Sequence, residues 1–92
     1  MSNDHESIVK MFYLNKLAEP VINAMGSEEA KKARNELESA IITYLYSSKM
    51  SEEATDTADQ ISWTLESLKY LEIMRMATDN FNEVMQKVGR EK

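Results

Sequence analysis

Residues that break helices are almost absent from this chain, and their scarcity constrains the fold more than any other feature. The 92 residues include two glycines, Gly26 and Gly89, and one proline, Pro20. Turns between β-strands depend on such residues, and few segments alternate apolar and polar residues as a strand does. The sequence therefore predicts an all-α fold, a small helical bundle.

Three main helices are expected, at about residues 4–25, 28–47 and 52–87. Gly26 can end the first helix, because glycine readily adopts the left-handed conformation that closes a helix. Ser27 and Ser51 are each followed by two glutamates. A serine cap with acidic residues in the first turn favours the start of a helix at both places.

The sequence allows two alternatives for the end of the third helix. Thr78, Asp79 and Asn80 are weak helix formers, so the helix either continues or divides near Asn80 and leaves a short fourth helix. At this length the chain is expected to form one domain over 1–92. Its ends, 1–4 and 89–92, are expected to be flexible.

In the first two helices, apolar residues recur every three or four positions, the period of a buried helix face. These residues are Ile8, Met11, Phe12, Leu14, Ala18, Val21, Ile22 and Met25, followed by Ala30, Ala33, Leu37, Ala40, Ile41, Tyr44 and Leu45. The charged remainder of the second helix, including Arg34 and Glu38, is expected to be solvated. Val9, Tyr13 and Leu17 form a second stripe on the first helix, which is either a wide core face or a contact with another chain.

The third helix changes its apolar face along its length. Its early apolar residues, Ala54, Ala58, Ile61, Leu65 and Leu68, fall within a sector of about 80°. Near Lys69 the apolar positions move to the opposite side. We therefore expect the first half to pack on its own chain and the second half on another copy. This long helix would then be shared in a homodimer through Leu71, Ile73, Met74, Ala77 and Phe81.

A ridge of acidic and aromatic residues lies opposite the early apolar sector. It contains Asp56, Asp59, Trp63, Glu66 and Tyr70. In one interpretation, Trp63 covers part of a neighbouring helix beside a solvated acidic face. In the other, the ridge binds a partner protein with a basic surface, since tryptophan and tyrosine are enriched at binding hot spots.

The charge distribution argues against direct binding to nucleic acid. The net charge is −5, and residues 51–92 hold nine acidic and five basic residues. Phosphate recognition requires clustered lysine and arginine. The sequence has no cysteine, no signal peptide and no apolar run of about 20 residues, so a cytoplasmic protein without membrane association is expected.

No residue pattern predicts catalysis, a metal site or a cofactor. His5, the only histidine, lies in a polar segment near the start of the chain. Glu52, Glu53 and Asp56 imitate half of a magnesium site of the kind found in helical nucleotide hydrolases, but the second carboxylate pair is missing. We expect a noncatalytic protein-interaction module that acts as an adaptor, inhibitor or regulator. The alternative is a small nucleotide- or magnesium-binding protein that uses carboxylates of the second and third helices.

Overall fold

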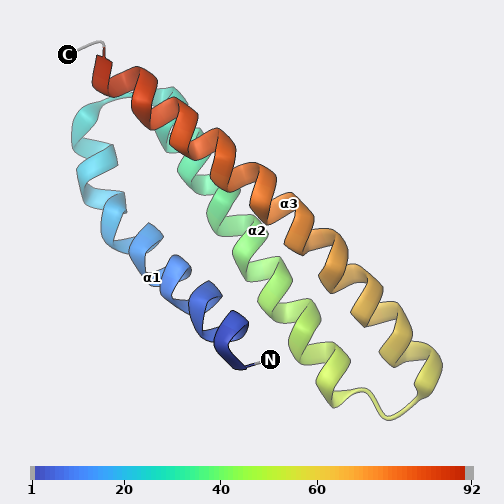
Figure 1. The fold of residues 1–92 in the computed structure, drawn as a ribbon. Helices are drawn as coiled ribbons and strands as arrows, with labels where there is room; N and C mark the ends of the chain where they lie inside the picture. The colour runs from blue at the N-terminus through green and yellow to red at the C-terminus, as the bar shows by residue number, and fades with distance from the viewer. Residues whose placement is uncertain (1, 91–92) are drawn as a thin grey trace.

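The computed structural model describes residues 2–90 and consists of three helices (Figure 1). They are α1 (Ser2–Met25), α2 (Glu28–Glu53) and α3 (Thr57–Arg90), and no strand occurs among the described residues. The all-α prediction and the three main helices are confirmed. Met1 and residues 91–92, which belong to the ends expected to be flexible, lie outside the described residues. Residues 2–4 and 89–90 continue α1 and α3.

The turn between α1 and α2 follows the sequence prediction. Gly26 has φ +72°, in the left-handed region that glycine enters without steric cost. The Ser27 hydroxyl accepts a hydrogen bond from the backbone N–H of Ala30 at 3.2 Å, which caps α2. α1 continues through Pro20 without interruption.

The turn between α2 and α3 lies further along the chain than expected. α2 extends to Glu53, so Ser51 lies in its last turn and does not cap the next helix. Asp56 takes that role, because its carboxylate accepts a hydrogen bond from the backbone N–H of Asp59 at 3.2 Å. A carboxylate beside the positive end of the α3 dipole is a favourable cap.

α3 does not divide near Asn80, and no fourth helix forms within residues 2–90. The Thr78 hydroxyl donates a hydrogen bond to the carbonyl oxygen of Met74 at 2.8 Å, which satisfies the side chain within the helix. Met74 and Phe81 pack in the core on either side of this segment. Tertiary packing therefore outweighs the weak helix propensity of residues 78–80.

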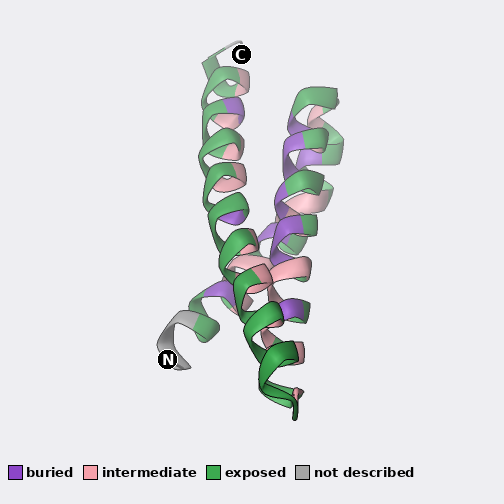
Figure 2. Ribbon diagram, turned by 90° about the vertical axis from the view of Figure 1, so that its right-hand side faces the viewer, coloured by how far each residue is buried: buried purple, intermediate pink, exposed green. Residues whose placement is uncertain are grey.

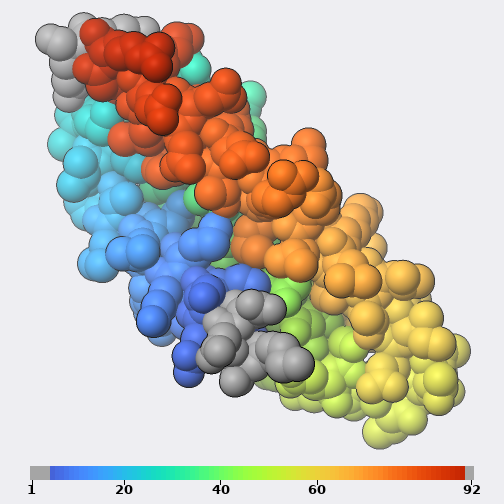
Figure 3. Space-filling view, viewed as in Figure 1, coloured from blue at the N-terminus to red at the C-terminus, as the bar shows by residue number. Residues whose placement is uncertain are grey.

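α2 and α3 form a long antiparallel hairpin, and α1 lies along only part of it (Figure 1). The molecule measures 53 × 19 × 18 Å. The N-terminal end of α1 lies near the middle of the hairpin, so the loop end of the hairpin extends past it as two helices (Figures 1 and 3). Buried residues are concentrated where the three helices meet and are sparse towards the loop end (Figure 2).

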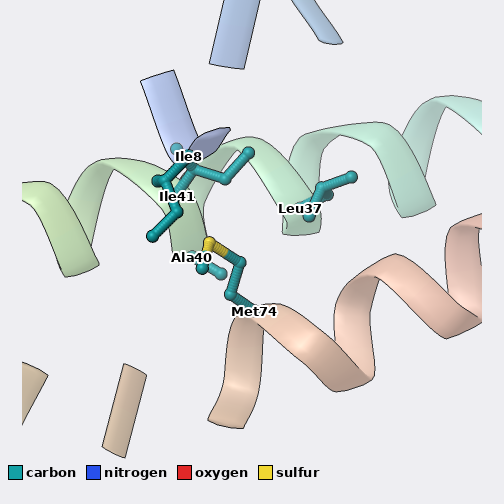
Figure 4. Packing of buried hydrophobic residues seen from close by; sticks show 5 residues of the cluster. All are labelled: Ile8, Leu37, Ala40, Ile41 and Met74. Atoms are coloured by element: carbon teal, nitrogen blue, oxygen red, sulfur yellow. The ribbon is translucent and has the colours of Figure 1, made fainter. Parts of the chain in front are cut away.

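The core consists of two clusters that each include residues from all three helices. The first contains Ile8, Leu37, Ala40, Ile41 and Met74 (Figure 4). The second contains Ile22, Ala30, Ala33 and Val84. Both clusters involve the second half of α3, so this half packs on its own chain. The expectation that this half packs on another copy was wrong, while the first half packs on α2 as expected but through its other face.

Candidate interaction surfaces

The two faces of the first half of α3 are reversed relative to the sequence prediction. Ile61, Leu65 and Leu68 are 56–61% exposed, whereas Trp63 and Tyr70 on the other side are half-buried. The reason lies along the rest of the hairpin, where the small side chains of α2 allow close helix approach. Ala33 and Ala40 are buried in the two core clusters that include residues of α3. This packing fixes which side of α3 faces α2 along its whole length, and the aliphatic residues are on the outer side.

The predicted ridge is therefore split between α2 and solvent. The rings of Trp63 and Tyr46 on α2 meet edge to face, with their centroids 5.7 Å apart and an interplanar angle of 82°. Asp56 and Asp59 are exposed, while Glu66 and Tyr70 are half-buried. This geometry agrees with the interpretation in which Trp63 covers part of a neighbouring helix, and it leaves the two aspartates available to attract a basic partner.

The residues predicted for self-association are also divided. Met74 is buried, and Ala77 and Phe81 pack against its cluster. Leu71 and Ile73 remain partly exposed. The apolar character of Met74, Ala77 and Phe81 is thus explained within one chain, and only the other two residues are accessible to a second copy.

Arg34 forms a buried polar contact that sequence reasoning missed. Its side chain is 4% exposed, so the expectation of a solvated position was wrong. Its Nη1 atom donates to Asn15 Oδ1 at 2.6 Å and to Glu38 Oε1 at 2.8 Å. Its Nη2 atom donates to Glu19 Oε2 at 3.1 Å. Nη2 also donates to Asn35 Oδ1 at 2.7 Å, so two carboxylates and two amides compensate for the burial of one guanidinium group.

A signal for this contact was present in the sequence. Asn15 lies seven residues after Ile8 and seven before Ile22, so it occupies the middle of the buried face of α1. A polar residue at a core position of a helix pair requires a partner, and it often sets the register of the two helices. The position of Asn15 could therefore have indicated a buried polar partner on the second helix, although this prediction was not made.

Glu38 completes this network at its solvent edge. The hydrogen bond from Arg34 lowers the pKa of the Glu38 carboxyl, and Lys16, whose Nζ lies 3.3 Å from Glu38 Oε1, lowers it further. Burial acts in the opposite direction and is outweighed. Glu38 is therefore held in its charged form, in contact with both α1 and α2.

The rotation of α1 that buries Asn15 exposes an apolar stripe on its outer side. Tyr13, Leu14, Leu17 and Val21, which we call the α1 stripe, are 63–72% exposed. Leu14 and Val21 were expected in the core, and this was wrong because Ile8, Asn15 and Ile22 take the side facing α2. Tyr13 and Leu17 are not part of a wide core face. Isolated apolar residues are common on surfaces, but four large ones on one helix face are typical of an interaction site.

An open groove also runs between α2 and α3. Its volume is about 950 Å³, and its α3 wall includes Tyr70, Ile73 and Met76. The α2 wall is polar and includes Lys31 and Lys32. The groove therefore has one apolar and one polar side, and its lining includes none of the described side chains of α1.

Two kinds of feature are absent from the part of the chain that the structure describes. It contains no group of three or more histidine, aspartate or glutamate side chains placed to hold a metal ion. None of its helices has the length and apolar character needed to cross a bilayer.

Comparisons of the chain with protein families, with curated proteins and with solved structures gave no match.

Proposed function

We propose that this protein is a noncatalytic helical interaction module that binds another protein through the α1 stripe. The observation that carries the proposal is the exposure of Tyr13, Leu14, Leu17 and Val21 on the side of α1 that faces away from α2. Keeping four large apolar side chains in water forgoes about 1.5–3 kcal/mol each relative to full burial. A partner that covers them recovers part of this free energy on binding.

The spacing of the stripe favours a helical partner. Its residues recur at three- and four-residue intervals, so they form a ridge along the helix axis that can pack against an amphipathic helix of another protein. Tyr13 provides an aromatic anchor with a polar tip, a combination enriched at binding hot spots. The net charge of −5 favours a partner with a basic surface.

Site-specific photo-cross-linking in the source cell tests this function. A photoreactive residue at position 17 is expected to capture a discrete protein partner. The same residue at Asn82, an exposed position on α3, is expected not to capture it. Equal capture at both positions, or none at position 17, would reject the α1 stripe as the binding surface.

A substitution then measures the contribution of the stripe. Leu17→Glu is expected to weaken binding of the captured partner at least about tenfold, because it buries an unpaired charge in the interface. Asn82→Glu serves as the matched control, since it adds the same charge at an exposed site on another helix. Unchanged affinity for Leu17→Glu would contradict the proposal.

A further inference from the structure

A second apolar surface lies on the loop end of the hairpin, where no third helix covers it. We call Ile61, Leu65 and Leu68 the α3 stripe. These side chains are more than half exposed and lie on the side of α3 opposite Trp63, whose ring packs on α2. The first half of α3 extends past the end of α1 (Figures 1 and 3). Beyond Leu68 the same side of the helix becomes charged, with Glu72 and Arg75 paired to each other.

The chain exposes more surface than a compact protein of its size. Its accessible surface is 6460 Å². A monomer of this mass is expected to expose about 5,500 Å², so the surplus is about 1,000 Å². The radius of gyration is 15.2 Å, against about 12 Å for a compact domain of this length. The surplus is close to the share of one partner in a standard protein interface, about 800 Å².

We propose that a second copy of this chain covers the α3 stripe, with the two α3 helices packed antiparallel about a two-fold axis near Leu65. Residues 61, 65 and 68 have the spacing of a coiled-coil seam. In an antiparallel pair centred near Leu65, Ile61 of each copy lies opposite Leu68 of the other copy. The same patch thus serves both subunits, as a two-fold interface requires.

Charge determines the direction of packing. Four exposed acids, Glu52, Glu53, Asp56 and Asp59, lie at the loop end of the hairpin. Parallel packing would bring the acidic loops of two copies together, which is unfavourable. Antiparallel packing separates them and places each loop near Arg75 of the other copy. Arg75 is exposed and can turn from Glu72 towards these acids.

This dimer surface is distinct from the α1 stripe, which is proposed to bind a different protein. It also differs from the surface expected from sequence, because Met74, Ala77 and Phe81 are part of the core of their own chain. The two proposals can therefore fail separately. Loss of the dimer would leave partner capture at Leu17 unaffected, and absence of a partner would leave the dimer intact.

Mass measurement is the first test. Sedimentation equilibrium from micromolar to about millimolar concentration is expected to give twice the chain mass of 10.6 kDa. Leu65→Glu, at an exposed position, is expected to weaken association at least about tenfold while keeping the helical circular dichroism spectrum. Leu17→Glu is the matched control and is expected to remain dimeric. A monomer at every concentration, or a dimer sensitive only to Leu17→Glu, would overturn the proposal.

Cysteine cross-linking tests the direction, because the natural chain has no cysteine. A disulfide requires Cα atoms within about 7 Å. In the antiparallel dimer, position 61 lies about 10 Å along the axis from its own counterpart, so Ile61→Cys and Leu68→Cys each fail to cross-link alone. An equimolar mixture of the two variants cross-links under mild oxidation. Cross-linking of each variant with itself, with no disulfide between positions 61 and 68 in the mixture, would show parallel packing and overturn the proposal.

Discussion

Arg34 of α2 lies with its Nη1 atom 2.6 Å from Oδ1 of Asn15 on α1, and both side chains are buried. Asn15 also donates from its side-chain amide to the backbone carbonyl of Arg34 at 3.4 Å. This reciprocal pair fixes both the rotation of α1 and its position along α2, because a shift in either would leave buried polar groups unpaired. The exposed α1 stripe is a consequence of this rotation.

Arg34→Ala is expected to lower the free energy of unfolding by about 3 kcal/mol, since it removes one partner of a buried network and leaves Asn15 without its strongest donor. Urea denaturation followed by circular dichroism measures the change. Lys87→Ala is the control, because Lys87 pairs with Glu29 at an exposed site outside the Arg34 network and the proposed dimer surface. It is expected to leave stability nearly unchanged. Equal effects of the two substitutions would contradict the structural role of Arg34.

Glu38 is expected to make stability depend on pH in the acid range. Its folded-state pKa lies below the ordinary value of 4.5, chiefly because Arg34 donates a hydrogen bond to it. The stabilisation is therefore fully present above pH 4.5 and is lost as the pH falls through the lowered folded-state pKa. Urea denaturation at neutral and acid pH is expected to show a smaller loss of stability on acidification in Glu38→Gln than in the natural chain.

Glu83→Gln provides the control for the pH experiment. Glu83 is an exposed residue of α3 outside the Arg34 network. This variant is expected to keep the acid sensitivity of the natural chain. If the stability of Glu38→Gln and of Glu83→Gln responds identically to acid, the contact between Arg34 and Glu38 is not the cause of the pH dependence of stability.

The helix count could be predicted because it follows from local chemistry, but one boundary could not. Ser-Glu-Glu-Ala occurs at Ser27 and again at Ser51. At Ser27 it follows a glycine that ends α1, and it caps a helix. At Ser51 no glycine or proline precedes it, so α2 continues and Asp56 caps α3 instead. The same four residues begin one helix and end another, and the preceding residues decide between these roles.

The buried face of the first half of α3 could not be predicted from the sequence period, because it depends on packing contacts further along the helix. Both sides of the first half of α3 carry apolar residues, with Ile61 and Leu65 on one side and Trp63 and Tyr70 on the other. Because Ile61 and Leu65 are aliphatic, the sequence predicted that their side of the helix faces the core. The contacts of Met74 and Val84 with α2, two to five turns further along, determine the rotation of the whole helix. The sequence identified the ridge residues but left open whether Trp63 covers a neighbouring helix, and the contact with Tyr46 of α2 agrees with that interpretation.

The different roles of the two serines predict different costs of substitution. Ser27→Ala is expected to destabilise the protein by about 1 kcal/mol, because it removes the acceptor for the N–H of Ala30. Ser51→Ala is expected to cost clearly less, since it removes exposed hydrogen bonds to the Thr64 hydroxyl and to the carbonyl oxygen of Gln60, and no helix cap. Thermal and urea denaturation measure both. A larger effect at Ser51 would indicate that α3 begins there after all.

Trp63, the only tryptophan, is expected to stabilise the loop end of the hairpin. Because its ring packs edge to face on Tyr46 and is half-buried, Trp63→Ala is expected to lower the free energy of unfolding by about 2 kcal/mol. Tyr46→Ala is expected to shift the tryptophan fluorescence to longer wavelength by admitting water beside the ring. Tyr13→Ala, which removes an exposed tyrosine of α1, is expected to leave this fluorescence unchanged. If Trp63→Ala does not alter stability and Tyr46→Ala does not move the emission, the ring is free of α2, and the ridge of Asp56, Asp59 and Trp63 becomes the better candidate for partner binding.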